Sequence, residues 1–357
     1  MIDADGSDLH ITAKRKPIME IGQEYTPLAD RALDIDESFY IANYLYGSDT
    51  ARTMVERGQH IDNNFVFKYK KDGDFLSKEY RFRLNVMPIT VRGNNVPSIT
   101  VRQLPPDPPK WTDMGYGEEL WSIFRPPSGL VFVSGPTGSG KSTLLASGIR
   151  RIAEDLENEK IITFEDPIEF VYDSFINDKV LIEQSAVGVN CVDFFSGMKP
   201  FLRRRPTIAV VGEARDQETI RTCLYAAQTG HLVYTTGHTN GAPESVKRLL
   251  NEFPVNEHES RLHDIIEVAS VFVSQRLFRK TTGGVIALRE VLHFNHEVKR
   301  YLEGINISNY VEKLRKATEL YGESMVLQGK KLFEEGVISE ETLNKIIIDF
   351  DRSDYDT

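Results

Sequence analysis

Residues 135–143 have the types and the spacing of a phosphate-binding loop. The segment reads Gly-Pro-Thr-Gly-Ser-Gly-Lys-Ser-Thr and fits the pattern GxxxxGK[ST]. It follows the apolar, strand-like run 130–134 and leads into the helix-compatible stretch 144–146, the context in which such a loop works. Glycines in such a loop let backbone N–H groups point at anionic oxygens, and the helix that follows adds partial positive charge. Lys141 would meet the β- and γ-phosphates, and Ser142 would offer its hydroxyl to Mg²⁺. We therefore expect the chain to bind a nucleoside triphosphate through Gly135, Thr137, Gly138, Ser139, Gly140, Lys141, Ser142 and Thr143.

Two acidic segments follow other apolar, strand-like runs. Residues 165–169, Glu-Asp-Pro-Ile-Glu, come directly after the run 161–164. Carboxylates at the end of a buried strand are costly to leave unpaired, so a metal, a water to be deprotonated or an arginine should compensate them. A solvated acidic turn is the alternative. The second segment, 212–216, follows the run 208–211 and places Glu213 where a P-loop enzyme needs an acidic group for its magnesium shell, a position that is more often aspartate.

Two histidines bracket a fourth apolar run, 232–234. His238 follows this run, at a strand end where a neutral donor could sense a γ-phosphate. His231 precedes the run and could be no more than a packed residue at the start of a strand.

Composition narrows the class of protein. The 357 residues suggest two domains, and the net charge of −10 disfavours a broad duplex-DNA surface. Cys191 and Cys223 form no CxxC pair, which suits a reducing cytosol and disfavours a structural zinc. No signal peptide and no run long enough for a membrane span are visible. We expect a cytosolic protein without a transmembrane segment that can still dock onto a membrane complex.

The pattern of apolar residues changes along the chain. Residues 65–69 and 80–86 alternate between apolar and polar types, which predicts antiparallel strands with one wet face. Residues 39–45 and 53–55 could be helices. Beyond the proline-rich stretch that begins at Leu104, strands become short continuous apolar runs separated by helical stretches, which predicts a parallel sheet covered on both faces. The expected divisions are an α+β domain at 1–104, a linker at 105–118, an ATPase domain at 119–300 and a helical region at 301–357.

The four polar segments, in this order, resemble those of the secretion ATPase superfamily, which powers type II secretion, type IV pili and type IV secretion. Residues 135–143 match its Walker A loop, 163–169 its Asp box, 211–216 its Walker B segment and 231–239 its His box. Outside these loops, 7–11 and 274–277 match further family segments. The resemblance implies an α/β fold, with a RecA-like P-loop domain preceded by a smaller, PAS-like α+β domain, and it implies ATP as the nucleotide.

Finer features look most like the pilus-retraction branch and its relatives that serve Dot/Icm secretion and IncI-type plasmid conjugation. Residues 170–173 and 288–290 carry this impression, and the missing cysteine tetrad disfavours the assembly motors. Two features depart from the pattern. Gly237 stands where relatives usually have leucine, and a glycine there is expected to loosen the backbone before His238. The terminal Ala-Ile-Arg-Asn-Leu-Ile-Arg signature is absent, so pilus retraction itself is not inferred.

The resemblance also implies a mechanism. Glu169 is expected to be the general base, with Glu165 and Asp166 supporting it, while Glu213 completes the metal shell through water. The family takes positive charge opposite the γ-phosphate from arginines of the N-terminal domain or linker. Arg102 ranks first here because residues 99–102 lead into the linker, and the other candidates are Arg81, Arg83 and Arg125.

The assembly implied by the resemblance is a homohexameric ring. Its domains would rotate with hydrolysis and drive inner-membrane components of a secretion, conjugation or pilus system, with no stable nucleic-acid binding. Three alternatives stay open: a ring-shaped helicase or DNA-pumping ATPase, a nucleotide-binding switch that hardly hydrolyses ATP, and a purely structural ring component.

Overall fold

Two structural units divide the chain, Met1–Asp107 and Pro108–Thr357. The structure is a computed structural model that describes residues 1–4, 6–21, 24–70, 77–104, 107–175 and 178–350. Residues 105–106 of the expected linker and 351–357 of the expected C-terminal region lie outside the described residues. No helix within the described ranges combines the length and the apolar character needed to cross a bilayer.

The first unit is an antiparallel sheet with two helices packed on it. The strand order is β3-β2-β1-β6-β5-β4. Phe82, Leu84 and Val86 are buried while Arg81 and Arg83 are only partly so, which confirms the alternation expected for 80–86. The strands and helices are β1 Asp8–Thr12, β2 Ile18–Ile21, β3 Glu24–Pro27, α1 Ile35–Tyr46, α2 Thr50–Glu56, β4 Ile61–Tyr69, β5 Lys78–Val91 and β6 Asn94–Leu104.

Local signals explain where α1 begins and ends. The carboxylate of Asp34 accepts the backbone N–H of Glu37, and the Glu37 carboxylate accepts the backbone N–H of Asp34, a capping box. Gly47, at φ +77°, ends the helix in the left-handed region that glycine adopts without strain. The helix then packs on the sheet through Phe39 and Ala42.

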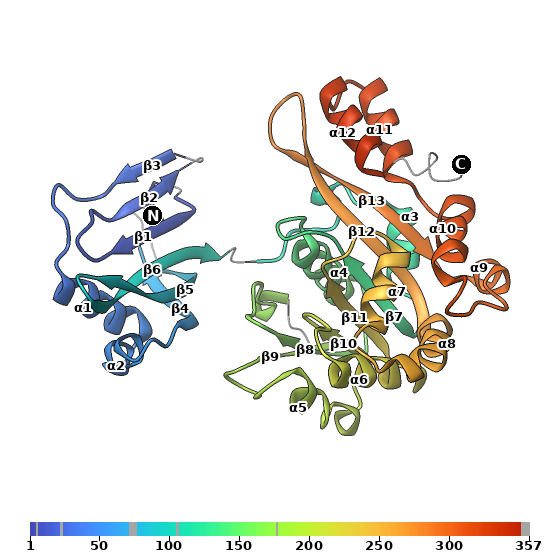
Figure 1. Cartoon of the computed structure of the whole chain (residues 1–357), viewed down its shortest axis with the longest axis horizontal. Helices are drawn as coiled ribbons and strands as arrows, with labels where there is room; N and C mark the ends of the chain where they lie inside the picture. The colour runs from blue at the N-terminus through green and yellow to red at the C-terminus, as the bar shows by residue number, and fades with distance from the viewer. Residues whose placement is uncertain (5, 22–23, 71–76, 105–106, 176–177, 351–357) are drawn as a thin grey trace. The chain divides into compact units, whose positions relative to one another are not determined.

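The second unit contains a seven-stranded sheet in the order β13-β12-β7-β11-β10-β8-β9 (Figure 1). Neighbouring strands are parallel except β12 and β13, which form an antiparallel hairpin. The apolar runs at 130–134, 161–164, 208–211 and 232–234 lie within β7, β8, β10 and β11, which confirms the parallel sheet. The strands are β7 Gly129–Ser134, β8 Glu159–Glu165, β9 Val180–Ala186, β10 Ile208–Val211, β11 Leu232–Gly237, β12 Ala269–Arg279 and β13 Val285–His293.

Helices cover both faces of this sheet. Val131 and Val133 of β7 face a core shared with α3 and α4, whereas Leu130 and Phe132 face the core under α5 to α10. The helices are α3 Glu118–Phe124, α4 Lys141–Asp155, α5 Phe194–Met198, α6 Gln217–Gln228, α7 Ala242–Leu250, α8 His258–Val268, α9 His296–Tyr301 and α10 Tyr310–Tyr321. Short 3₁₀ turns lie at Thr112–Met114, Asp173–Phe175, Phe201–Arg204 and Val255–Glu257.

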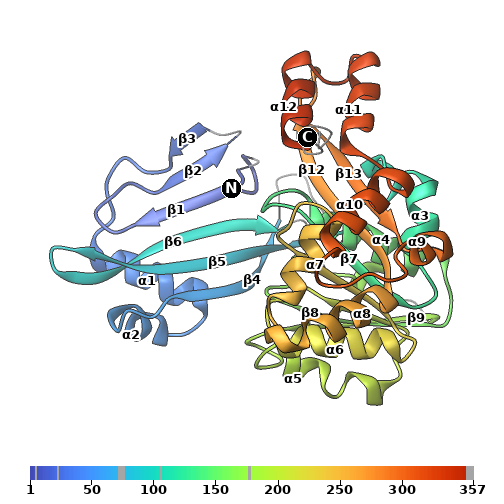
Figure 2. The same cartoon turned by 45° about the vertical axis from the view of Figure 1, so that its right-hand side comes forward.

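The chain ends in a pair of helices, α11 Met325–Glu334 and α12 Glu340–Phe350, which lie side by side next to the β12–β13 hairpin (Figures 1 and 2). They share a small core of their own with β13, built on Leu288, Met325, Ile338 and Ile346. The predicted helical character of the C-terminal region is therefore confirmed as far as residue 350.

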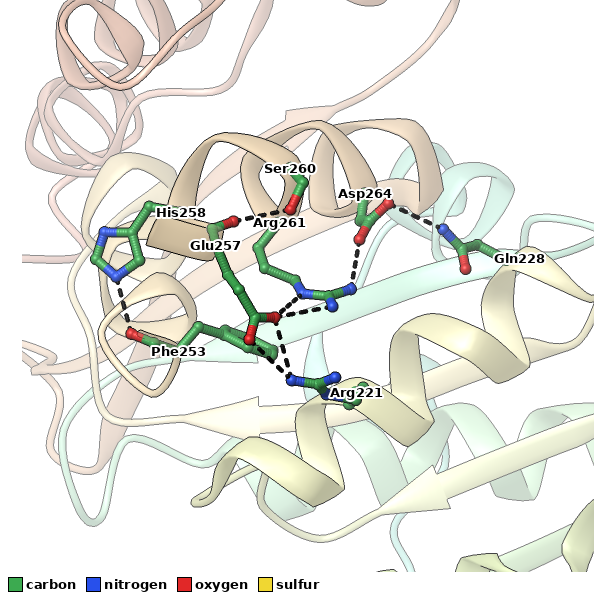
Figure 3. A network of polar contacts seen from close by, with 8 residues as sticks. All are labelled: Arg221, Gln228, Phe253, Glu257, His258, Ser260, Arg261 and Asp264. Carbon is green, nitrogen blue, oxygen red and sulfur yellow. Dashed lines mark hydrogen bonds and ion pairs between the residues drawn. The ribbon is translucent and has the colours of Figure 1, made fainter. Parts of the chain in front are cut away.

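An ionic network fastens α6 to α8 (Figure 3). The Oε2 atom of Glu257 lies 3.1 Å from Nη2 of Arg221 and 3.0 Å from Nε of Arg261. Arg261 also donates to Asp264 at 2.7 Å, and both guanidinium groups lie over the ring of Phe253. Because one carboxylate serves two arginines, the network fixes two helices that cover the same face of the sheet.

Candidate active site

The phosphate-binding loop connects the end of β7 to the start of α4, as its sequence predicts. Lys141 is the first residue of α4, and its Nζ donates to the carbonyl oxygens of Gly135 at 2.8 Å and Pro136 at 3.1 Å. Burial lowers the pKa of Lys141, and the charges of Glu213 and Glu169 oppose that shift. The two carboxylates are thus close enough to act on the ammonium group.

The loop has the features of an anion site. Gly135, at φ +141°, lies so close to β12 that a Cβ atom there would be 2.3 Å from the carbonyl oxygen of Gln275. Gly140, at φ +81°, precedes α4, and no side chain caps the amino end of that 15-residue helix. The hydroxyl of Ser139 is buried without a hydrogen-bond partner among the described residues. A bound phosphate would supply acceptors to these donors, so the residues fit the triphosphate.

Three of the predicted loops meet at the carboxyl ends of β8, β10 and β11. The Oε2 atom of Glu213 accepts a hydrogen bond from Nε of Arg215 at 2.9 Å and lies 3.5 Å from Nε2 of His238. Arg215 also reaches the Oδ2 atom of Asp166 at 3.4 Å. The fold therefore joins Asp166, Glu213 and His238 into one cluster, with Arg215 as the bridge.

The backbone before His238 is not loosened by Gly237, contrary to the expectation from sequence. Gly237 is buried at the end of β11, in register with Ser134 of β7. A Cβ atom on Gly237 would lie 2.5 Å from Cζ of Phe132, so the glycine makes room for that ring. The neighbouring Thr236 donates its hydroxyl to the carbonyl of Gly212 at 2.5 Å, which ties the end of β11 to the loop after β10.

Ser142 and Glu213 offer the ligands of a magnesium site rather than a complete protein cage. Ser142 is exposed in the first turn of α4, and the side chain of Glu213 is 20% exposed. Among the residues that the structure describes, no three His, Cys, Asp or Glu side chains gather around a metal position. Mg²⁺ in nucleotide sites usually keeps several waters and takes its other ligands from phosphates and one or two protein groups, so these residues fit it.

Glu165 and Glu169, in the same acidic segment, have different surroundings. Glu165 ends β8 and accepts hydrogen bonds from the hydroxyl of Thr163 at 2.6 Å and from the amide of Gln184 at 3.1 Å. Glu169 lies near enough to Lys141 for its charge to raise the pKa of that lysine. Glu165 is thus held by hydrogen bonds within the sheet, whereas the charge of Glu169 acts on the lysine of the phosphate loop.

Arg125 and His231 lie at the amino ends of the strands, opposite to the ends that carry the phosphate loop and the acidic cluster. Arg125 pairs with Glu159, the first residue of β8, at 2.6 Å. His231 precedes β11, where its ring lies 3.1 Å from the carbonyl oxygen of Ala226 and its own carbonyl accepts the N–H of Gly129. Both side chains are therefore far from the carboxyl ends of the strands, and the fold does not bring them to the phosphate loop of their own chain.

The other candidate arginines belong to the first unit. Arg102 on β6 donates to Asp8 at 2.8 Å, and its side chain is 65% exposed while that of Asp8 is 8% exposed. Arg83 on β5 makes two hydrogen bonds with Asp62, at 3.1 and 2.7 Å. Arg81 lies two residues earlier on the same strand. Arg102 thus has a buried anchor and a largely exposed guanidinium.

Some contacts of the site were not expected from the sequence. An arginine was among the groups expected to compensate the carboxylates of 165–169, and Arg215 is such a partner for Asp166, although no pattern in the sequence pointed to Arg215 itself. Gln275 on β12 donates to the carbonyl oxygen of Ser139 at 2.7 Å, and Arg289 on β13 donates to the amide oxygen of Gln275 at 2.8 Å. The segments 274–277 and 288–290 are part of the resemblance, but no local pattern predicts the contact between Gln275 and Ser139, because these two residues are 136 positions apart.

Comparisons with known proteins agree with this architecture. A family model described as type II/IV secretion system protein matches residues 53–337. The chain is 30% identical over 338 residues to the type IV pilus retraction ATPase PilT of Pseudomonas aeruginosa, covering 94% of this chain and 92% of that protein. It is 35% identical over 299 residues to a twitching motility protein of Neisseria gonorrhoeae, covering 84% of this chain and 75% of that protein.

Solved structures are similar over almost the whole chain. The ATPase DotB of Legionella pneumophila superposes with a TM-score of 0.88 and 34% identity, covering 98% of this chain and 93% of that one. The pilus retraction motor PilT with bound ADP superposes with a TM-score of 0.82 and 30% identity, covering 97% and 94%.

Proposed function

The chain belongs to the type II/IV secretion system protein family and is an ATPase, and we propose that it works as a hexameric traffic ATPase. In this proposal, ATP hydrolysis drives a type IV secretion, conjugative transfer or pilus apparatus at the inner membrane. The observation that carries the proposal is the cluster of Asp166, Glu213 and His238 beside the phosphate loop. The charges of Glu213 and Glu169 act on Lys141 of that loop and oppose the lowering of its pKa by burial.

In the proposed mechanism, Lys141 exchanges the carbonyl oxygens of its own loop for the β- and γ-phosphates. Glu169 orients the attacking water and accepts its proton, and a positioned base of this kind contributes about 10² to 10⁴ in rate. Glu213, through water, and Ser142 would hold Mg²⁺, which neutralises charge on the phosphates when it is bound. His238 responds to the loss of the γ-phosphate through its contact with Glu213.

Positive charge opposite the γ-phosphate would come from a neighbouring subunit, with Arg102 as the first candidate. Support comes from its exposed guanidinium and its buried partner Asp8, because an anchored arginine loses less freedom when it engages a phosphate. The contact between neighbouring subunits would then depend on whether ATP or ADP is bound. Hydrolysis in the ring would in this way drive rotation of its domains. The protein would sit on the cytoplasmic side of the inner membrane through partner proteins and would bind no nucleic acid stably.

Phosphate release by the purified full-length protein tests the enzymatic part. We expect Lys141→Ala to abolish turnover, and Glu169→Gln to stop hydrolysis while ATP still binds in calorimetry. Lys199→Ala, an exposed lysine outside the site, is the control. Full activity in the Glu169→Gln protein would remove that residue as the base. Mass photometry with a slowly hydrolysed ATP analogue tests the ring, and a pull-down from membrane fractions tests the docking partner.

A further inference from the structure

Gln275 of β12 contacts the phosphate loop with both its backbone and its side chain. A Cβ atom on Gly135 would lie 2.3 Å from the carbonyl oxygen of Gln275, and one on Gly140 would lie 3.0 Å from its amide nitrogen. The amide nitrogen donates to the carbonyl oxygen of Ser139 at 2.7 Å, and the whole side chain is buried. The loop is therefore held by the strand that lies on the side of β7 opposite to β11.

Arg289 of β13 determines which end of the Gln275 amide faces the loop. An amide side chain has an acceptor oxygen at one position and a donor nitrogen at the other, and a half-turn exchanges them. Nε of Arg289 donates to the amide oxygen of Gln275 at 2.8 Å, and a hydrogen bond from a charged donor is stronger than one between neutral groups. Because the oxygen is held in this way, the amide nitrogen is directed to Ser139. The reversed amide would bring its oxygen against the carbonyl oxygen of Ser139, and the two oxygens would repel each other.

The guanidinium of Arg289 is fixed by Tyr116. It lies 4.2 Å over the tyrosine ring, an attraction that offsets part of the cost of burying a charge. Burial raises the pKa of the Tyr116 hydroxyl, while the charge of Arg289 and hydrogen bonds from Arg289 and Gln275 oppose that shift. Tyr116 belongs to the segment that leads from Pro108, where the second unit begins, to α3, and it packs against the ring of Trp111 at 4.9 Å. The first anchor of Arg289 is thus the segment that opens the second unit.

The backbone of Arg289 is fixed by helix α11. The amide oxygen of Gln328 accepts the backbone N–H of Arg289 at 3.1 Å, and the amide nitrogen of Gln328 donates to the backbone carbonyl of Arg289 at 2.8 Å. Two bonds to the same residue restrict both the position and the tilt of its peptide groups. Figure 2 shows α11 beside the β12–β13 hairpin. Helix α11 is therefore the second anchor of Arg289.

We propose that Arg289 is a positioning residue for ATP hydrolysis, which acts through Gln275 to hold the phosphate loop in the conformation that receives the phosphates. The inference rests on the proposed function and adds to it a connection from the loop to Tyr116 and to α11. In this role Arg289 needs no contact with the reacting atoms. Its effect comes from order in the loop, since a misplacement of about 1 Å in a site can cost about 10² in rate. A displacement of residues 108–117 or of α11 would reach the loop through the same contacts.

Steady-state ATP hydrolysis by the full-length protein separates positioning from binding. Arg289→Met and Gln275→Met roughly keep the length of each side chain and remove its polar group. We expect each variant to lower kcat by about tenfold and to change KM by less than about threefold, because Lys141 and the backbone N–H groups of the loop still bind the phosphates. The matched control is Arg279→Met, since Arg279 is exposed on the same strand as Gln275, and its kcat should not change.

Two further measurements test the path of contacts. The double variant should lose no more kcat than either single variant, because both substitutions break the same connection. Amide hydrogen exchange of residues 135–141 in the nucleotide-free protein should be faster in both single variants and unchanged in Arg279→Met. This second measurement reports the order of the loop without any enzymatic turnover.

Unchanged kcat in a folded Arg289→Met protein would overturn the inference, and so would losses that multiply in the double variant. If thermal melting shows that Arg289→Met does not fold, Gln275→Met decides in the same way, because methionine has nearly the volume of glutamine. A rise in KM at constant kcat would also count against positioning, since it would mean that only binding is affected. The proposed function itself fails in a different way: the wild-type protein would then release no phosphate that depends on Lys141.

Discussion

Nε2 of His238 lies 3.5 Å from Oε2 of Glu213, so a side chain from the end of β11 contacts the side chain that follows β10. The same carboxylate oxygen accepts a hydrogen bond from Arg215. A change at the γ-phosphate that moves Glu213 would therefore act on His238 directly and, through Arg215, on Asp166 in the loop after β8. This contact supports the proposed roles of His238 in sensing and of Glu213 in the metal shell.

His238→Gln should reduce ATP turnover strongly, by about 10² in kcat, while ATP affinity changes little, because the contact to Glu213 acts on the terminal phosphate. Steady-state phosphate release and calorimetry check this. His231→Gln is the control. Because His231 lies at the amino end of β11, away from the phosphate loop, this variant should leave kcat unchanged. Equal loss in both variants would contradict a specific role for His238.

Arg102→Ala should abolish turnover if the arginine acts on the nucleotide of a neighbouring subunit. Mixed with the Glu169→Gln protein, it should regain part of its activity, because some interfaces then combine an intact arginine with an intact base. Arg52→Ala, another exposed arginine of the first unit, serves as the control. Absence of recovery in the mixture would argue against action between subunits.

Gly237→Leu should destabilise the protein by about 1 to 3 kcal/mol, because the new side chain overlaps the ring of Phe132. Phe132→Leu in the same protein should recover part of that loss by making space, even though it is destabilising alone. Chemical denaturation of both single variants and the double variant measures the coupling. If the losses of unfolding free energy in the two single variants simply add in the double variant, Gly237 is not needed to make room for Phe132.

Glu257→Gln should lower the melting temperature at neutral pH and have less effect in acid. Hydrogen bonding to Arg261, with the charges of Arg221 and Arg261, holds the pKa of Glu257 below its ordinary value. A carboxyl whose folded pKa is depressed stabilises the protein above its unfolded pKa and loses that contribution as the pH falls through the folded one. Melting curves at pH 7 and pH 4 test this, and a pH-independent difference would contradict it.

Local sequence was sufficient for the elements whose signals are local. Runs such as 161–164 and 208–211 are short, rich in β-branched and aromatic residues and followed by polar segments, a pattern typical of buried parallel strands. The β12–β13 hairpin gave a weaker signal, because polar residues such as Gln275 and Arg289 interrupt it. Those two residues are polar since they support the phosphate loop, and that reason exists only in the folded chain.

The sequence by itself determined that a phosphate loop stands between a strand and a helix, and that acidic and histidine-bearing segments follow other strands. Tertiary structure decided which of these side chains meet. Strand order put Glu213 and His238 on one side of the loop and Gln275 and Arg289 on the other. The physical reason is that strand order is set by packing between distant segments, which no local spacing of residues encodes.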